Sequence, residues 1–115
     1  MGIIDEHVQR GVAFKIDGKY DEATAELLEA IGLDQSNTEA HRQLGLVYGF
    51  EGRFDESIEA LKAAVHISTS SVAARADLGI TYAMLGMFDE AKAEFEIVLS
   101  IDPENEIARK QMIYF

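Results

Sequence analysis

The sequence predicts an all-α protein made of three stacked helix pairs with one further helix at its C-terminal end. One phrase carries most of this prediction: Gly, any residue, an aromatic residue, Asp and Glu follow one another from Gly18, Gly52 and Gly86, each time 34 residues apart. Around each phrase, apolar residues recur at helical spacing, and no segment shows the sustained alternation typical of strands. A fixed period of this length is typical of a stacked repeat array.

The period divides the chain, which we expect to form a single domain over residues 1–115, into three full units and a partial fourth. The full units cover residues 4–37, 38–71 and 72–105, and the partial unit covers 106–115. Each full unit is long enough for two helices. We expect helices near residues 4–17, 21–33, 38–51, 55–67, 72–85, 89–100 and 104–114, with ends accurate to a few residues.

The first helix of each unit is best seen in the middle unit. Ala40, Leu44 and Val47 are spaced at i, i+4 and i+7, so they form one apolar face. Gly52 then ends this helix, because glycine readily adopts the left-handed conformation that follows a helix C-terminus.

The second helix of the middle unit begins with Asp55, as its N-cap or as an acid in its first turn, where negative charge is favourable. Gly45 in the first helix and Ser57 in the second are both small. We therefore predict that the paired helices approach closely at these two residues, with Tyr48 and Leu61 filling the space beside the contact.

Composition excludes several classes of protein. The chain has 48% hydrophobic and 27% charged residues, a net charge of −11 and no cysteine. Such acidity without a basic stripe disfavours nucleic acid as a partner. No apolar run is long enough for membrane insertion, and the N-terminus lacks the features of a signal peptide. We expect a soluble, cytoplasmic protein without disulfides or thiolate metal sites.

No group of residues forms a catalytic or cofactor-binding motif. The three histidines, His7, His41 and His66, are separated in the sequence and more typical of surface positions than of metal ligands. Paired acids such as Asp55 and Glu56 recur at every second helix, which favours a role at the helix start over acid–base chemistry. No glycine-rich phosphate loop is present. We expect neither an enzyme nor a protein with a cofactor or metal.

The repeated unit resembles a tetratricopeptide repeat (TPR). The residues that carry the resemblance are Leu-Gly-x-x-Tyr from Leu44, the phrase Gly-x-Phe-Asp-Glu-Ser from Gly52, and Pro103 between repeats. The resemblance covers residues 4–105. The chain departs from the pattern at Arg10, where leucine is expected, and in the column of His7, His41 and Arg75, where tryptophan is common.

The resemblance implies a right-handed superhelix whose first helices line a concave, partner-binding face. The residues at the family's contact positions, which define the candidate groove, are Val8, Val12, Lys15, Ile16, Arg42, Gln43, Leu46, Phe50, Ala76, Asp77, Ile80, Met84, Lys110 and Tyr114. Gly49, Ala83 and Gln111 occupy further such positions. Two columns of this groove are apolar in all three units, which predicts a partner segment of apolar character.

The same alignment argues against one known partner class. TPR domains that dock the acidic C-terminus of a chaperone use a clamp of basic and amide side chains. At the clamp positions this chain has Val8, Val12, Gln43, Ala73 and Asp77. Because only Gln43 is a near substitute and Asp77 has the wrong sign, chaperone docking is disfavoured.

The expected function is therefore protein–protein interaction, as a scaffold or assembly module that holds an extended or helical segment. One alternative is a secretion-type chaperone that shelters an apolar segment, since class II chaperones of that kind resemble three acidic TPR units. Another is the regulatory part of a larger enzyme or sensor.

The two ends of the array differ in polarity. Arg10 stands where the later units have Leu44 and Leu78, as expected for an uncovered first unit. The last six residues, KQMIYF, are largely apolar, and neighbours about 100° apart on a helix cannot share one buried face. We expect this surface to contact a second copy, forming a homo-oligomer, or further sequence.

Overall fold

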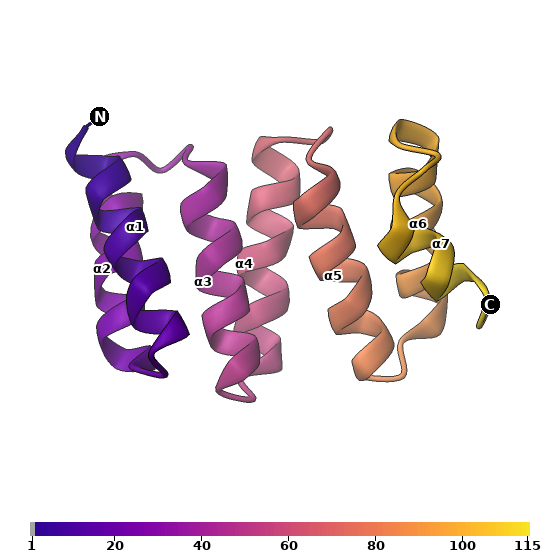
Figure 1. The fold of residues 1–115 in the computed structure, drawn as a ribbon, viewed down its shortest axis with the longest axis horizontal. Coiled ribbons are helices and arrows are strands. Elements are labelled where there is room, and N and C mark those ends of the chain that lie inside the picture. The colour runs from indigo at the N-terminus through magenta and orange to yellow at the C-terminus, as the bar shows by residue number, and fades with distance from the viewer. Residues whose placement is uncertain (1) are drawn as a thin grey trace.

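The computed structural model describes residues 2–115, which form seven helices and no strand. They are α1 (Ile3–Ile16), α2 (Tyr20–Leu33), α3 (Thr38–Phe50), α4 (Phe54–Ile67), α5 (Val72–Met84), α6 (Phe88–Ile101) and α7 (Glu106–Met112). The predicted helices are confirmed within one or two residues at most ends (Figure 1). The last is shorter than expected, because Asn105 caps α7 and a turn replaces its final residues.

Each pair is joined by a tight turn that contains the repeated glycine. Gly18, Gly52 and Gly86 have φ of 75°, 76° and 76°, the left-handed region in which glycine is unstrained. The aromatic residue two positions later begins the second helix. The acids that follow lie in the first turn rather than at the N-cap: Asp55 follows Phe54, and Arg53 occupies the cap position. Their charge stabilises the helix through its macrodipole.

The turns between repeats end in a residue whose side chain caps the next helix. Asn37, Ser71 and Asn105 precede α3, α5 and α7, and the side-chain oxygen of each accepts a hydrogen bond from the backbone N–H three residues later. Such caps satisfy amides that have no partner within the helix. The segment that contains Ser71 is therefore the turn between the second and third repeats, which agrees with the predicted repeat boundary after residue 71.

The paired helices touch where the sequence predicted close approach. A Cβ atom placed on Gly45 would lie 2.7 Å from Cγ of Leu61 and 3.2 Å from the backbone oxygen of Ser57. The Ser57 hydroxyl donates a hydrogen bond of 2.8 Å to the Gly45 carbonyl oxygen. Gly11 against Leu27 and Gly79 against Phe95 repeat the arrangement in the other pairs.

The core consists of two clusters of buried apolar residues, one from Val8 to Ala60 and one from Leu61 to Ala108. Leu27, Val47, Leu61, Phe95 and Val98 are fully buried. The N-terminal end of the array is polar, as predicted.

At that end, Arg10 is exposed and bonds Glu26 at 3.1 Å, whereas Leu44 and Leu78, in the same column, are only 5% and 3% exposed. The repeats that have a preceding neighbour therefore bury an apolar residue here.

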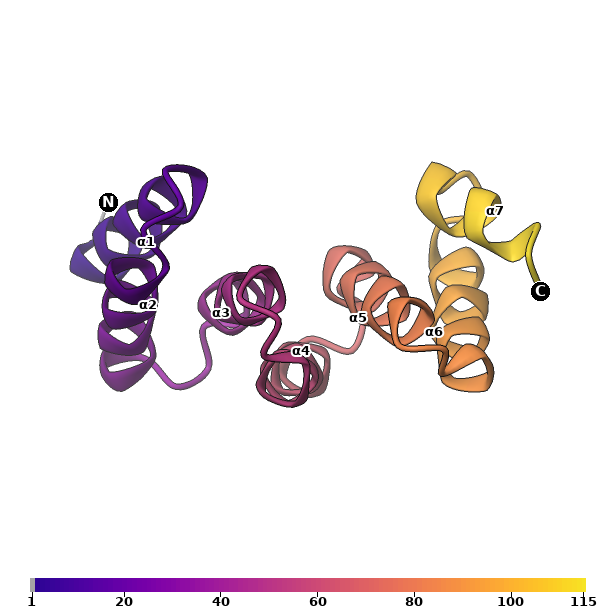
Figure 2. The same cartoon turned by 90° about the horizontal axis from the view of Figure 1, so that it is seen from below.

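The array is curved, with dimensions of 40 × 27 × 20 Å. Figure 2 shows α1 and α7, near the two ends, rising above the central pair, so that the first helices line the concave side. In the first two pairs, the second helix lies on the opposite, convex side. No helix within residues 2–115 has the length and apolarity needed to cross a membrane.

Candidate functional site

Three apolar side chains on the concave side are exposed to an unusual degree. Ile16, Phe50 and Met84 lie in the last turns of α1, α3 and α5 and are 76%, 62% and 65% exposed. They hold the same position in three successive repeats, and α3 contacts both α1 and α5. We call these three residues the exposed row.

A second row lies one helical turn earlier. Val12, Leu46 and Ile80 precede the exposed row by four residues and therefore share its helix face. All three are half-buried. The members of the two rows on α3 and α5 line a cleft of about 240 Å³ between these helices, whereas Val12 and Ile16 on α1 lie outside it. Its lining residues are Gly45, Leu46, Gly49, Phe50, Phe54, Ser57, Asp77, Ile80, Thr81 and Met84.

Phe50 is held in place from the neighbouring repeat. Its ring stacks on that of Tyr20, the first residue of α2, with centroids 6.2 Å apart and an interplanar angle of 29°. Stacked aromatic pairs of this kind contribute about 0.5–1.5 kcal/mol beyond the area they bury. Phe50 is thus both exposed and oriented, which suits a residue that contacts a partner.

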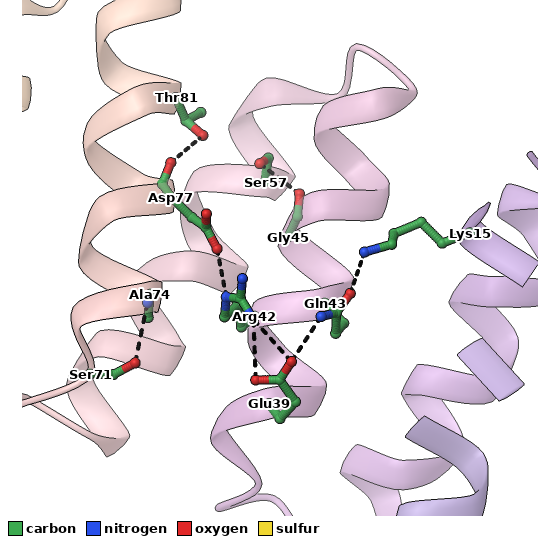
Figure 3. A network of polar contacts seen from close by, with 10 residues as sticks. All are labelled: Lys15, Glu39, Arg42, Gln43, Gly45, Ser57, Ser71, Ala74, Asp77 and Thr81. Atoms are coloured by element: carbon green, nitrogen blue, oxygen red, sulfur yellow. Dashed lines mark hydrogen bonds and ion pairs between the residues drawn. The ribbon is translucent and has the colours of Figure 1, made fainter. Parts of the chain in front are cut away.

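Beside the apolar rows lies a polar network that links three repeats. Arg42 Nε donates to Asp77 Oδ2 at 2.6 Å, and Arg42 also bonds Glu39 at 3.0 Å. Gln43 donates to Glu39 at 2.8 Å and accepts from Lys15 Nζ at 2.6 Å. Figure 3 shows the network reaching from α1 through α3 to α5. Its two cations and two carboxylates balance one another.

The pKa values of these groups reflect partial burial within the network. Burial raises the pKa of Asp77, although Arg42 acts in the opposite direction. Burial and repulsion from Arg42 lower the pKa of Lys15. For Arg42, burial acts to lower the pKa, but Asp77 and Glu39 outweigh it and the pKa is raised. The Arg42 charge is therefore fixed in place by its two acidic partners.

Three of the predicted groove residues are buried. Val8 is only 9% exposed and Ala76 only 3%, and both belong to the apolar core. Their side chains pack within the array, so we remove them from the groove. Gln43 is also buried, at 7%, but it contributes through its bonds to Lys15 and Glu39.

The predicted groove residues of the last helix lie apart from the cleft. Lys110 and Tyr114 are both exposed, Tyr114 by 82%. Tyr114 borders a separate hollow, together with Ala83, Phe88, Gln111 and Phe115. The structure therefore joins five of the predicted groove residues in one cleft and places Tyr114 in another. The five are Leu46, Phe50, Asp77, Ile80 and Met84.

Sequence reasoning missed Phe54 and Thr81 in the cleft and Glu39 in the network. Phe54 belongs to the repeated phrase, so its aromatic character was assigned to the repeat alone. Glu39 precedes Arg42 by three residues, which places the two on one helix face and was the available signal. Within residues 2–115, no group of three or more His, Asp or Glu side chains is placed to hold a metal ion.

Comparison with protein families agrees with the paired helices and the period. A tetratricopeptide repeat model matches residues 51–112, and a second TPR model matches residues 11–49. The chain belongs to the tetratricopeptide repeat family. No curated protein sequence matches this TPR chain.

Solved TPR domains superpose on nearly the whole chain. The first TPR of Spaghetti (RPAP3), bound to an HSP90 peptide, is 23% identical, with a TM-score of 0.91 over 96% of this chain and 88% of that one. The second TPR domain of human RPAP3, in complex with the HSP70 peptide SGPTIEEVD, is 26% identical, with a TM-score of 0.89 over 97% and 93%. YrrB, described as having an unusual peptide-binding site, is 23% identical, with a TM-score of 0.86 over 97% and 58%.

The clamp positions of this TPR domain carry no free cation in the part of the chain that the structure describes. Val8 is buried, Val12 is half-buried and Ala73 is exposed. Asp77 is paired with Arg42, and Gln43 with Lys15. The concave face thus combines a charge-balanced centre with an exposed apolar edge.

Proposed function

We propose that this TPR domain is a protein-interaction module that binds an apolar segment of a partner protein along its concave face. The observation that carries the proposal is the exposed row of Ile16, Phe50 and Met84. Clustered exposed apolar side chains are typical of interaction sites. Full burial of each would contribute about 1.5–3 kcal/mol, which favours association once the cost of ordering the partner is met.

The charge of the site defines the partner further. The HSP70 peptide bound to the human RPAP3 domain ends in Glu-Glu-Val-Asp and is acidic. In this chain, the concave cations Arg42 and Lys15 are already bonded to Asp77 and Gln43. Arg42 is paired with Asp77 and Glu39, and the same two carboxylates act on the charge of Lys15, so an acidic tail would meet as much negative as positive charge there. We infer that the partner segment is recognised through apolar side chains.

The groove is tested by adding two charges to it. Peptides selected from a random displayed library against the wild-type domain should be rich in apolar residues. Leu46→Asp with Phe50→Asp should weaken their binding by roughly 30-fold or more, because each carboxylate must be desolvated without a counter-ion. Isothermal titration calorimetry measures the change, and circular dichroism checks that the helices remain.

The matched control is Leu33→Asp with Ile101→Asp, which adds the same charge at exposed apolar positions at the ends of α2 and α6. This control should bind like the wild type. SGPTIEEVD serves as a direct probe and should show no binding. Selected peptides that bind the groove variant as tightly as the wild type would place the site elsewhere.

We also propose that two copies associate through the apolar residues that follow α7. Met112 and Phe115 pack against the core, which leaves Ile113 and Tyr114 exposed by 79% and 82%. A contact in which both copies use this same patch is the commonest symmetry for a homodimer. This apolar patch is separate from the cleft between α3 and α5.

Ile113→Lys with Tyr114→Lys is expected to turn the dimer into a monomer, because like charges would then face each other across the contact. Light scattering coupled to size exclusion measures the mass at several concentrations. Ile3→Lys with Leu33→Lys, at the opposite end of the array, should leave the dimer intact. A wild type that stays monomeric at high concentration contradicts the proposal.

A further inference from the structure

The middle repeat lacks a polar contact between its two helices that the repeats on both sides possess. In the first repeat, His7 Nδ1 lies 2.7 Å from Glu26 Oε2, which joins α1 to α2. In the third, Arg75 donates to Glu94 at 3.0 Å, which joins α5 to α6. The corresponding residues of the middle repeat are His41 and Ala60, 34 residues from each pair. His41 instead contacts the backbone oxygen of Gln35 at 3.0 Å.

Ala60, which replaces the glutamate of the other repeats, lines an open hollow on the convex side of the domain. The hollow has a volume of about 460 Å³ and lies between α2 and α4, with α3 as its floor. Figure 2 shows α2 and α4 as separate helices on the convex side, with α3 between them. The lining residues are Leu28, Ile31, His41, Leu44, Tyr48, Asp55, Glu56, Glu59, Ala60 and Ala63.

Two further residues depart from the repeat pattern at this hollow. Leu28 is 49% exposed, whereas the same column has Lys62 and Glu96. Glu59 is exposed at the rim, whereas its counterparts are both alanine, Ala25 and Ala93.

Compared with its neighbours, the hollow has therefore lost a charge from its floor and gained one at its edge. These departures act together, because they make the floor apolar and the rim acidic.

The acidic rim is only partly neutralised by the chain itself. Glu56 bonds Arg53 at 2.8 Å. Among residues 2–115, neither Asp55 nor Glu59 takes part in an ion pair. The rim therefore carries two carboxylates whose charge is open to a cationic partner.

The hollow continues along α4 and forms a groove. A second hollow shares Leu28, Ile31, His41 and Ala63 with the first and extends to Gly32, Gln35, His66 and Ile67. Together they follow α4 from Asp55 to Ile67, which at 1.5 Å per residue is about 18 Å. That length accommodates about three turns of a helix. We call this feature the convex groove.

We propose that the convex groove is a second docking site, which binds a basic amphipathic helix of another protein. The apolar face of such a helix would cover Leu28, Ala60 and Ala63, and its lysines or arginines would lie beside Asp55 and Glu59. The length, the apolar floor and the unpaired acids all fit this occupant. The site is on the opposite side of the domain from the concave groove, so the two proposals stand independently.

The test uses the chain's own third repeat as a template. His41→Arg with Ala60→Glu places the Arg75–Glu94 ion pair in the middle repeat, fills the floor with charge and leaves the net charge unchanged. The fold should tolerate it, because the neighbouring repeat uses the same pair. The probe is a synthetic peptide of about 14 residues with leucines at i, i+3, i+4 and i+7 and lysines at most other positions. A matched peptide carries glutamates in place of the lysines.

The wild type should bind the lysine peptide at least tenfold more tightly than the glutamate peptide, and the His41→Arg/Ala60→Glu variant should lose at least tenfold of that affinity. Methyl resonances of Leu28, Ala60 and Ala63 should shift when the lysine peptide is added. Equal affinity of the variant and the wild type would overturn the proposal, since only bulk charge would then be at work. The Leu46→Asp/Phe50→Asp variant should keep lysine-peptide binding, which separates this result from that of the concave groove.

Discussion

Gly45→Leu is expected to lower the free energy of unfolding by about 1–3 kcal/mol or more, because the larger side chain overpacks the contact between the paired helices α3 and α4. Even the first atom of a side chain collides here, at 2.7 Å from Cγ of Leu61. The Ser57 backbone oxygen, 3.2 Å away, is fixed by the helix and cannot retreat. A whole isobutyl group must therefore push α3 and α4 apart.

The loss should spread beyond one pair, because each repeat is stabilised mainly by its neighbours. For a domain of this size, each kcal/mol corresponds to a fall of roughly 4–8 °C in Tm. Thermal melting followed by circular dichroism measures this shift. Gly79→Leu, which faces Phe95, should behave in the same way.

The chain offers a matched control for the glycine substitutions. Gly32 lies within α2, and a Cβ atom there would have no neighbour within 4 Å. Gly32→Leu should therefore leave Tm unchanged or raise it, because leucine is the better helix former by roughly 0.5–1 kcal/mol. Equal losses at Gly45 and Gly32 would show that close packing against the partner helix is not what makes Gly45 sensitive to a larger side chain.

The helix pairing could be predicted from the sequence because it depends on local rules. The 34-residue period set the repeats, and the positive φ of Gly52 and the close approach of Gly45 to Leu61 followed from residue size and conformational freedom. These properties belong to one turn or one helix pair. Because the chain contains three copies of the pattern, each of these local features could be recognised in three places.

The exposure of the groove residues could not be predicted in the same way. Val8 and Ala76 share the concave helices with Ile16 and Met84, yet the first two are buried and the last two exposed. Which of them is covered depends on how far each repeat rotates relative to the next. Many contacts between repeats together determine that rotation, so it cannot be predicted from any single column of the aligned repeats.

The polar contacts between repeats could likewise not be predicted from the 34-residue period. Arg42 and Asp77 are 35 residues apart, one more than the repeat, so an alignment by columns never sets them side by side. The missing polar contact of the middle repeat could have been found from the sequence. Opposite charges stand in the columns of Arg75 and Glu94, and Ala60 breaks the pattern. Recognising its absence required knowing that the residues in these two columns contact each other.

Phe95→Ala is expected to destabilise the domain by about 3–5 kcal/mol, as large-to-small changes of buried aromatics do. Phe95 is fully buried, faces Gly79 across the last helix pair and lies 6.2 Å from the ring of Phe115. Its removal would leave a cavity and also loosen the C-terminal residues that pack on it. Urea unfolding measures the loss.

The same site predicts a compensating second change. Gly79→Ala alone should be destabilising, because its Cβ would lie 2.9 Å from Cε1 and Cζ of Phe95, whose ring is enclosed on all sides. In the Phe95→Ala background the ring is gone, so the new methyl group fills part of the cavity and the helix gains roughly 1 kcal/mol of propensity. The effect of Gly79→Ala on the free energy of unfolding should then change sign, so that the substitution becomes stabilising. A double-mutant cycle measures this coupling directly. Additive effects of the two substitutions would show that the ring is not what keeps position 79 a glycine.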